Sequence, residues 1–282
     1  MKELGAPVVV GVNDKQPTAL RFALREAGRT GGSLRVVHSA GHPAQTLEFL
    51  SGTGVVMENI QEAGQDVLDD AKHFIQQEIT AVSVDYVRAE AAPIEALESE
   101  ARAAHVLVVG TDDISWPDRL LGGSISAHLS GHAACPVVVV PERAYPTPLS
   151  GGVCIALDGD TSAEGPLRVA HEQAEARNTC LHVLHATPPG TQRSDMDVIR
   201  ANVSEVLAGW SNVFPGVRVL LSFPIDDPEE ACVRATEHAE LVVVGRPHGR
   251  TLPFSLARPL ASRVIRRAHC PVAIVPSSYR GQ

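Results

Sequence analysis

The chain has 282 residues, which is long enough for two domains of about 140 residues, each with its own hydrophobic core. With 44% apolar and 20% charged residues the composition is globular, which argues against a disordered chain. The formal net charge of -9 argues against sequence-independent nucleic-acid binding, because such binding needs a basic surface to release counterions from phosphates.

The apolar runs and the cysteines predict the cellular location of the protein. The N-terminal apolar run ends at Asn13, Asp14 and Lys15 and lacks the core of a signal peptide. No apolar run approaches the ~18 residues that a membrane helix needs. Five cysteines without a CxxC spacing fit a reducing cytoplasm better than a disulfide framework. We therefore expect a soluble, cytoplasmic protein that binds neither nucleic acid nor membrane.

In the first half of the chain, apolar runs alternate with segments of helical periodicity, which indicates βαβ units and a parallel sheet. Pro93 suits the first turn of the third predicted helix. The runs that predict strands are rich in Val and Leu or alternate apolar with polar residues: 8–12, 34–38, 82–86, 106–109 and 137–140. The predicted helices carry apolar residues three and four positions apart: Leu20, Ala23, Leu24 and Ala27; Ile60, Ala63, Val67, Ala71 and Phe74; Ile94, Leu97, Ala101 and Ala104.

The second half of the chain repeats this order, which indicates a duplication. Asp227 and Pro228 open its third helix with a capping carboxylate and a first-turn proline. A segment with several prolines at residues 141–151 has the composition of a linker, so we predict domains at 1–146 and 147–282. The matching segments are 8–13 and 153–158, 34–38 and 181–185, 106–110 and 241–245, and 135–141 and 270–276. The second helix of this copy is marked by Met196, Ile199, Val203, Val206 and Trp210.

The apolar runs 106–109 and 241–244 are typical of central strands that helices cover on both faces. Each domain is therefore predicted to be a doubly wound parallel sheet of about five strands. In such sheets ligands bind beyond the carboxyl ends of the strands, where the strand order reverses. The loops after the first and fourth strands are the candidate sites.

At these loops the sequence resembles the universal stress protein family, and the resemblance covers nearly the whole chain as two copies. The family pattern opens with a strand that ends in Gly-Val-Asp-Gly-Ser. It closes with Gly-x-x-Gly, nine residues, Gly-Ser, a helix and a Cys-Pro-Val-Val-Val-Val strand. In the first copy Gly110 has Asp113 at the second glycine position, and Gly123-Ser124 stand in register. The resemblance implies two tandem five-stranded sheets with the adenine nucleotide alpha-hydrolase-like fold, packed as a pseudo-dimer.

The resemblance also implies a nucleotide site, with ATP as the possible cofactor. Small residues let backbone N–H groups approach phosphates, and the following helix N-terminus offers unpaired donors. In ATP-binding members the adenosine lies against the ends of the first and second strands. The candidate cofactor-binding residues are Val12, Asn13, His38, Gly110, Asp113, Gly123, Ser124, Ile125 and Ser126 in the first copy, and Leu157, Asp158 and Gly245 in the second.

Both copies depart from the family pattern. In the first, Asn13 replaces the family aspartate, and Asp113 puts a carboxylate beside the expected phosphates. Two such charges about 5 Å apart repel by about 1 kcal/mol or more at an effective dielectric near 20, unless a metal ion or Lys15 lies between them. The second copy keeps the aspartate, Asp158, but its phosphate loop is replaced. His248 stands at the second glycine position and Arg258-Pro259 at the Gly-Ser position, and proline lacks the N–H donor.

The remaining polar clusters leave alternatives open. Six arginines follow the fourth strand of the second copy and form either a solvated helix face or an anion site. His128 and His132 have the spacing of metal ligands, but surface or interface roles are favoured and no metal site is predicted. Cys135 and Cys270 are expected to be buried. No catalytic triad or carboxylate pair is found. The arginines are Arg246, Arg250, Arg258, Arg263, Arg266 and Arg267.

These features favour a non-enzymatic stress-response protein that acts through interactions and has degenerate nucleotide sites. The alternative is an adenine-nucleotide sensor with one functional site, which the first domain would hold. The runs Val137–Val140 and Val272–Val275 are short apolar edges by analogy with the family, and such edges tend to pair. We therefore predict that the domains pair through these strands and that the chain forms a homodimer. We also expect it to bind a further protein partner, which the sequence does not identify.

Overall fold

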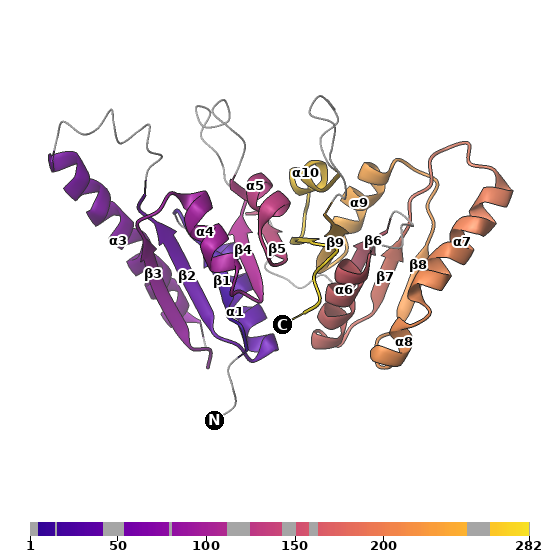
Figure 1. Ribbon diagram of the computed structural model, residues 1–282, viewed down its shortest axis with the longest axis horizontal. Coiled ribbons are helices and arrows are strands. Elements are labelled where there is room, and N and C mark those ends of the chain that lie inside the picture. Colours follow the sequence, from indigo (N-terminus) through magenta and orange to yellow (C-terminus); the bar gives the residue numbers. More distant parts are fainter. Residues whose placement is uncertain are drawn as a thin grey trace. The chain divides into compact units, whose positions relative to one another are not determined.

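The structure is a computed structural model of the chain (Figure 1). It describes residues 5–14, 16–41, 54–78, 81–111, 125–142, 151–157, 163–246 and 260–281, with the backbone alone at 54–63. The chain divides into two compact domains, Met1–Glu142 and Arg143–Gly281. Each is described by itself.

The first domain is built on a sheet of five parallel strands in the order β3-β2-β1-β4-β5. The order reverses between β1 and β4, as in other doubly wound sheets. Every residue of β1, β4 and β5 is buried, since these strands are apolar throughout and helices cover both faces. The strands are β1 (Val8–Gly11), β2 (Leu34–Ser39), β3 (Val84–Ala89), β4 (Val106–Gly110) and β5 (Val137–Val140).

The helices of the first domain pack in two pairs on its sheet (Figure 1). Helix α1 contacts α3, and α4 contacts α5. Pro93 lies in the first turn of α4, as predicted, because proline there has no N–H to lose. The helices are α1 (Pro17–Thr30), α3 (Gly54–Gln77), α4 (Pro93–Ala101) and α5 (Ile125–His132).

The buried face of α3 differs from the one predicted. Leu68, Ala71 and Ile75 are buried, whereas Val67 and Phe74 are only half-buried. The apolar pattern identifies the helix correctly, but two overlapping apolar rows leave its rotation about the axis undetermined. Contact with the sheet then selects the row centred on Leu68.

The second domain has the same topology, with parallel strands in the order β10-β9-β6-β7-β8. The prediction of a doubly wound, five-stranded parallel sheet is therefore confirmed for both domains. Its central strands are apolar and buried, while β8 is partly exposed. The strands are β6 (Val153–Ala156), β7 (Leu181–Leu184), β8 (Val219–Ser222), β9 (Leu241–Gly245) and β10 (Val272–Val275).

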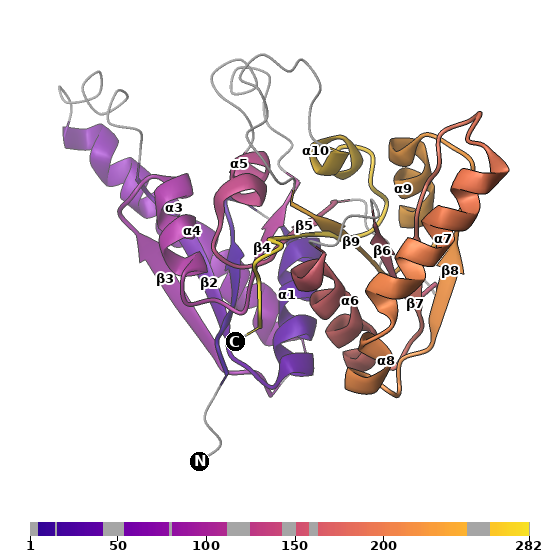
Figure 2. The same ribbon diagram turned by 45° about the vertical axis from the view of Figure 1, so that its right-hand side comes forward.

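The second domain has five helices in its described part. Where the sequence pattern predicts a single helix that ends at Trp210, the structure has two. The periodic run that ends at Trp210 is split: α7 stops at Leu207 and Trp210 begins a separate short helix, which Figure 2 shows in orange beyond the end of α7. Gly209, which disfavours a helix interior, stands between them. The helices are α6 (Glu164–Ala176), α7 (Arg193–Leu207), α8 (Trp210–Val213), α9 (Pro228–Thr236) and α10 (Leu260–Ile265).

The cap predicted for α9 is confirmed. The Asp227 carboxylate accepts hydrogen bonds from the backbone N–H groups of Glu229 at 2.8 Å and Glu230 at 3.3 Å, and Pro228 follows it. The carboxylate thereby satisfies two of the N–H groups that a helix start leaves without an intrahelical partner.

The duplication is also visible in a side-chain contact that both domains make. In the first domain the Arg21 guanidinium lies 5.1 Å from the centroid of the Phe74 ring. In the second, Arg168 lies 5.7 Å from the ring of Trp210. Each contact joins the first helix of its domain to the helical segment after the second strand. Within the described residues, no helix is long and apolar enough to cross a membrane.

Candidate functional site

In the first domain, a buried histidine joins the carboxyl ends of the first two strands. The Nδ1 atom of His38 lies 2.9 Å from the carbonyl oxygen of Val12, and the ring is 7% exposed. A carbonyl only accepts hydrogen bonds, so Nδ1 carries the proton and donates it. The Nε2 atom faces Gly64 of α3, where an added Cβ would lie 3.2 Å away.

The second domain makes the same contact with a residue that sequence reasoning passed over. Nδ1 of His185 lies 2.9 Å from the carbonyl oxygen of Leu157, and His185 is 9% exposed. The available signal was the repeat itself, because residues 34–38 and 181–185 both end in histidine. Val12 and Leu157 also donate equivalent backbone hydrogen bonds, to Val37 and Leu184, each at 2.9 Å.

Three of the predicted residues of the first domain share one edge of the sheet. The register pairs Gly11 with Val37 on one side and with Val109 on the other. Val12, which directly follows β1, therefore lies at the same level as His38 on β2 and Gly110 at the end of β4. This is the place where the strand order reverses.

Gln16, which the sequence did not single out, lies beside Gly110. An added Cβ on Gly110 would be 3.2 Å from the amide Cδ and Nε2 atoms of Gln16. The Oε1 atom of Gln16 is buried and has no hydrogen-bond partner among the described residues. In the second domain the corresponding glycine, Gly245, faces the Pro166 ring at 3.5 Å instead. The first domain thus presents an amide acceptor at this edge and the second an apolar ring.

The other predicted site residues are placed separately or lie outside the described part. Ile125 and Ser126 are the first residues of α5, and Ser126 is 5% exposed, with its carbonyl oxygen accepting from the Ser130 hydroxyl at 2.6 Å. Asn13 is exposed. Asp113, Gly123, Ser124 and Asp158 lie outside the described residues.

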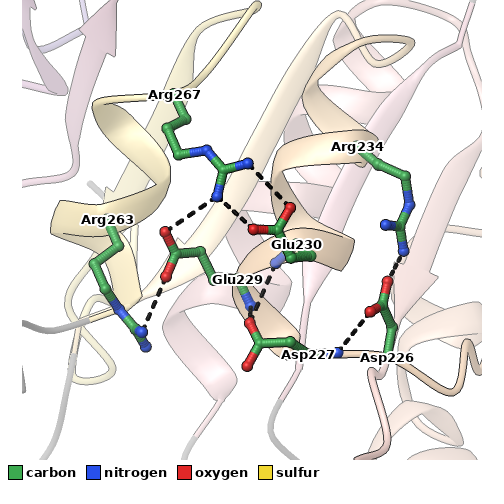
Figure 3. Close-up of polar contacts among 7 residues, drawn as sticks. All are labelled: Asp226, Asp227, Glu229, Glu230, Arg234, Arg263 and Arg267. Carbon is green, nitrogen blue, oxygen red and sulfur yellow. Dashed lines mark hydrogen bonds and ion pairs between the residues drawn. The ribbon is translucent and has the colours of Figure 1, made fainter.

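The arginine cluster of the second domain is partly engaged in ion pairs that join α10 and the residues just after it to α9 (Figure 3). Arg263 Nη1 lies 2.9 Å from Glu229 Oε2. Arg267 forms a fork with Glu230, with Nη1–Oε1 at 2.6 Å and Nη2–Oε2 at 3.0 Å. This fork lowers the pKa of Glu230 below its ordinary value, because the hydrogen bonds favour the carboxylate. Arg234 pairs with Asp226 on the same surface.

The first domain joins the corresponding helices with histidine in place of arginine. Nε2 of His128 on α5 lies 3.1 Å from Glu98 Oε1 on α4. The His128 and His132 rings stack, with centroids 4.4 Å apart. Across the described residues, no group of three His, Cys, Asp or Glu side chains could hold a metal ion.

The cysteines of the repeated Cys-Pro sequences are buried, as predicted. Burial raises the pKa of Cys270 to about 12, so this thiol stays protonated and unreactive near neutral pH.

Two domains, each with a doubly wound parallel sheet and a histidine bound to the chain just after its first strand, define a tandem α/β protein. The model of the "Universal stress protein family" matches residues 6–141 and 152–276, so the chain belongs to that family and contains two copies of its domain. The resemblance identified from the sequence is confirmed.

Full-length relatives and a solved structure agree with this assignment. A universal stress protein of Mycobacterium tuberculosis is 30% identical over 292 aligned residues, with 96% of each chain covered. One of Mycolicibacterium smegmatis is 27% identical over 288 residues, with 97% of each covered. The crystal structure of a universal stress protein from Archaeoglobus fulgidus superposes with a TM-score of 0.73 at 17% identity, covering 98% of this chain and 97% of that one. This last likeness supports the fold.

Proposed function

We propose that the chain is a non-enzymatic stress-response protein that acts through protein interactions and whose nucleotide sites have degenerated. The observation that carries the proposal is the pairing of Arg263 and Arg267 with Glu229 and Glu230. These two cations, which could replace part of the lost phosphate loop of the second domain, are neutralised by carboxylates of the same domain. An anion would have to displace both glutamates to use these guanidinium groups.

Departures from the family pattern in the expected phosphate loops also support degenerate nucleotide sites. Pro259 lacks an N–H at the Gly-Ser position of the second copy, and Asp113 adds a negative charge at a glycine position of the first. These residues lie outside the described part, so this support comes from the sequence alone.

The proposed interactions include the two domains themselves and a second copy of the chain. Val137–Val140 is the terminal strand in the order of the first domain and Val272–Val275 in that of the second. Both are entirely apolar, and apolar terminal strands tend to pair. We propose that they pair the domains as a pseudo-dimer. The cytoplasmic location is part of the same proposal, and five cysteines that form no disulfide are compatible with a reducing compartment.

A second candidate function is an adenine-nucleotide sensor that uses the first domain. It is favoured by the shared edge of Val12, His38 and Gly110 at the strand-order reversal. The unpartnered Oε1 atom of Gln16 at this edge is an acceptor that suits an amino or hydroxyl group of a nucleoside. ATP is the cofactor that this candidate implies.

One experiment separates the two functions. Nucleotide released from the denatured purified protein is identified by mass spectrometry, and ATP with magnesium is then titrated calorimetrically into the ligand-free protein. The interaction function predicts no released nucleotide and no binding at millimolar ATP. Micromolar binding that Gly123→Glu abolishes would instead establish the sensor. Gly131→Glu is the matched control, because an added Cβ on Gly131 meets nothing within 4 Å.

A further inference from the structure

A thiol and an imidazole lie together in the second domain, at the amino end of β7. The Sγ atom of Cys180 lies 3.2 Å from Nε2 of His182. Cys180 directly precedes β7 and His182 is the second residue of that strand, whereas His185 follows its carboxyl end. The pair is therefore a separate feature from the edge at Leu157.

Cys180 differs from every other cysteine of the chain. All five cysteines lie in described parts, and Cys135, Cys154, Cys232 and Cys270 are buried while Cys180 is partly exposed. Burial raises the pKa of Cys154 to about 12 and that of Cys232 to about 11. A buried, protonated thiol is a poor nucleophile, because the thiolate is the reactive form. Cys180 is the one cysteine that is partly exposed, and its sulfur has an adjacent base.

In the first domain, an arginine stands at the position that corresponds to His182. Arg35 occupies the second place of β2, as His182 does in β7, and binds Asp85 at 3.2 Å and Glu100 at 3.0 Å. In the register of the second domain, Leu220 stands where Asp85 stands in the first. An apolar side chain on β8 thus replaces the carboxylate that β3 presents in the first domain. His182 instead contacts the thiol of Cys180.

Room for the sulfur is created by a glycine on the neighbouring chain segment. Gly152 has a φ of +71°, and an added Cβ there would lie 2.5 Å from the carbonyl oxygen of Cys180 and 3.1 Å from its Sγ atom. A side chain at residue 152 would collide with the Cys180 backbone and press on the sulfur.

We propose that Cys180 and His182 form an oxidant-sensitive thiol site that reacts with small hydroperoxides. Nε2 of His182 accepts the thiol proton, and the sulfur attacks one peroxide oxygen. The O–O bond breaks, and the leaving oxygen takes the proton from the imidazolium and departs as water or an alcohol. The sulfur is oxidised to a sulfenic acid while the peroxide is reduced.

The site is tested on the full-length native protein by two reactions. Limiting hydrogen peroxide with a dimedone trap reports sulfenic acid, and iodoacetamide reports thiolate reactivity; peptide mapping locates both modifications. We expect both at Cys180 before any other cysteine. We expect His182→Gln to slow alkylation about tenfold at neutral pH, because the variant lacks the imidazole that accepts the thiol proton. The alkylation rate of this variant should also rise at higher pH than that of the parent.

Controls separate a chemical role of His182 from a structural one. His238→Gln alters an exposed histidine of the same domain and should leave the rate and its pH profile unchanged. Circular dichroism and thermal unfolding check that His182→Gln remains folded. Cys180→Ser should lose the modification altogether. Native labelling that begins at a buried cysteine, or an unchanged pH profile in His182→Gln, would overturn the proposal.

Discussion

The imidazole of His171 stacks on the indole of Trp210, with ring centroids 5.0 Å apart and ring planes 13° apart. His171 is 1% exposed and its Nδ1 atom donates to the Leu167 carbonyl oxygen at 2.8 Å. Its Nε2 atom is buried and has no hydrogen-bond partner among the described residues. Burial lowers the pKa of His171, and Arg168 already lies over the same indole. A second positive charge in this cluster is therefore unfavourable.

Acid should destabilise the second domain through His171. The folded pKa lies below the unfolded value of 6.5, so the unfolded chain binds a proton that the folded domain does not. This contribution to stability is complete above pH 6.5 and is lost as the pH falls towards the folded pKa. The slope is at most about 1.4 kcal/mol per pH unit for one proton. Urea unfolding followed by tryptophan fluorescence between pH 5 and 8 measures it.

His171→Leu is the informative variant for this pH dependence. Glu172, whose pKa burial raises, is present in both proteins, so comparison with the parent isolates the histidine. The slope below pH 6.5 should become shallower in the variant. An exposed-histidine variant, His238→Gln, should retain the parental slope. Equal slopes in His171→Leu and the parent would show that another group is responsible.

Gly165→Ala should strongly destabilise the second domain. An added Cβ would lie 2.3 Å from the carbonyl oxygen of Pro276 and 2.9 Å from that of Ser277, and backbone atoms cannot swing aside. We expect a loss of about 1–3 kcal/mol, the usual effect of overpacking. Gly209→Ala is the control, because its Cβ meets nothing within 4 Å and its φ is -82°. That change should stabilise by about 0.4–1 kcal/mol in urea unfolding.

Asp227→Ala should weaken the start of α9. The substitution leaves the N–H groups of Glu229 and Glu230 without the carboxylate, and the loss of such a cap costs about 1 kcal/mol. Hydrogen exchange at these two amides should become faster. Asp195→Ala removes a first-turn acid that does not cap α7 and should change stability by less than about 0.5 kcal/mol. Equal losses in both variants would contradict a specific role for the cap.

His38→Phe and His185→Phe should have parallel effects in the two domains. Each keeps an aromatic ring but removes the N–H that a buried carbonyl oxygen accepts, at Val12 or Leu157. Leaving such an acceptor unpaired costs about 1–3 kcal/mol. Domain-resolved hydrogen exchange should show each loss in its own domain. A loss in one domain alone would mean that the repeated contact is not equivalent in the two copies.

Local patterns carried most of the fold prediction. The runs at β4 and β9 identify central strands because a strand buried on both faces must be apolar at every position. Asp227 and Pro228 predict the start of α9 because a cap depends on residues that are close in sequence. In contrast, the rotation of α3 depends on how that helix meets the sheet.

The candidate site could be predicted only in outline. His38 was chosen from the family resemblance, and the contact of its Nδ1 with Val12 depends on two strands whose register the sequence does not state. Gln16 carried no sequence signal, because its amide matters only through its position beside Gly110. The four site residues outside the described part keep the status of predictions.

By itself the sequence determined the duplication, the order of strands and helices, and the family, because periodicity and motif spacing are properties of neighbouring residues. Tertiary structure alone decided which side chains meet. It paired Arg267 with Glu230 and separated one reachable thiol, Cys180, from four buried ones. Charge and thiol chemistry depend on burial and on distances of a few ångströms, and folding sets these through contacts between segments that are far apart in the chain.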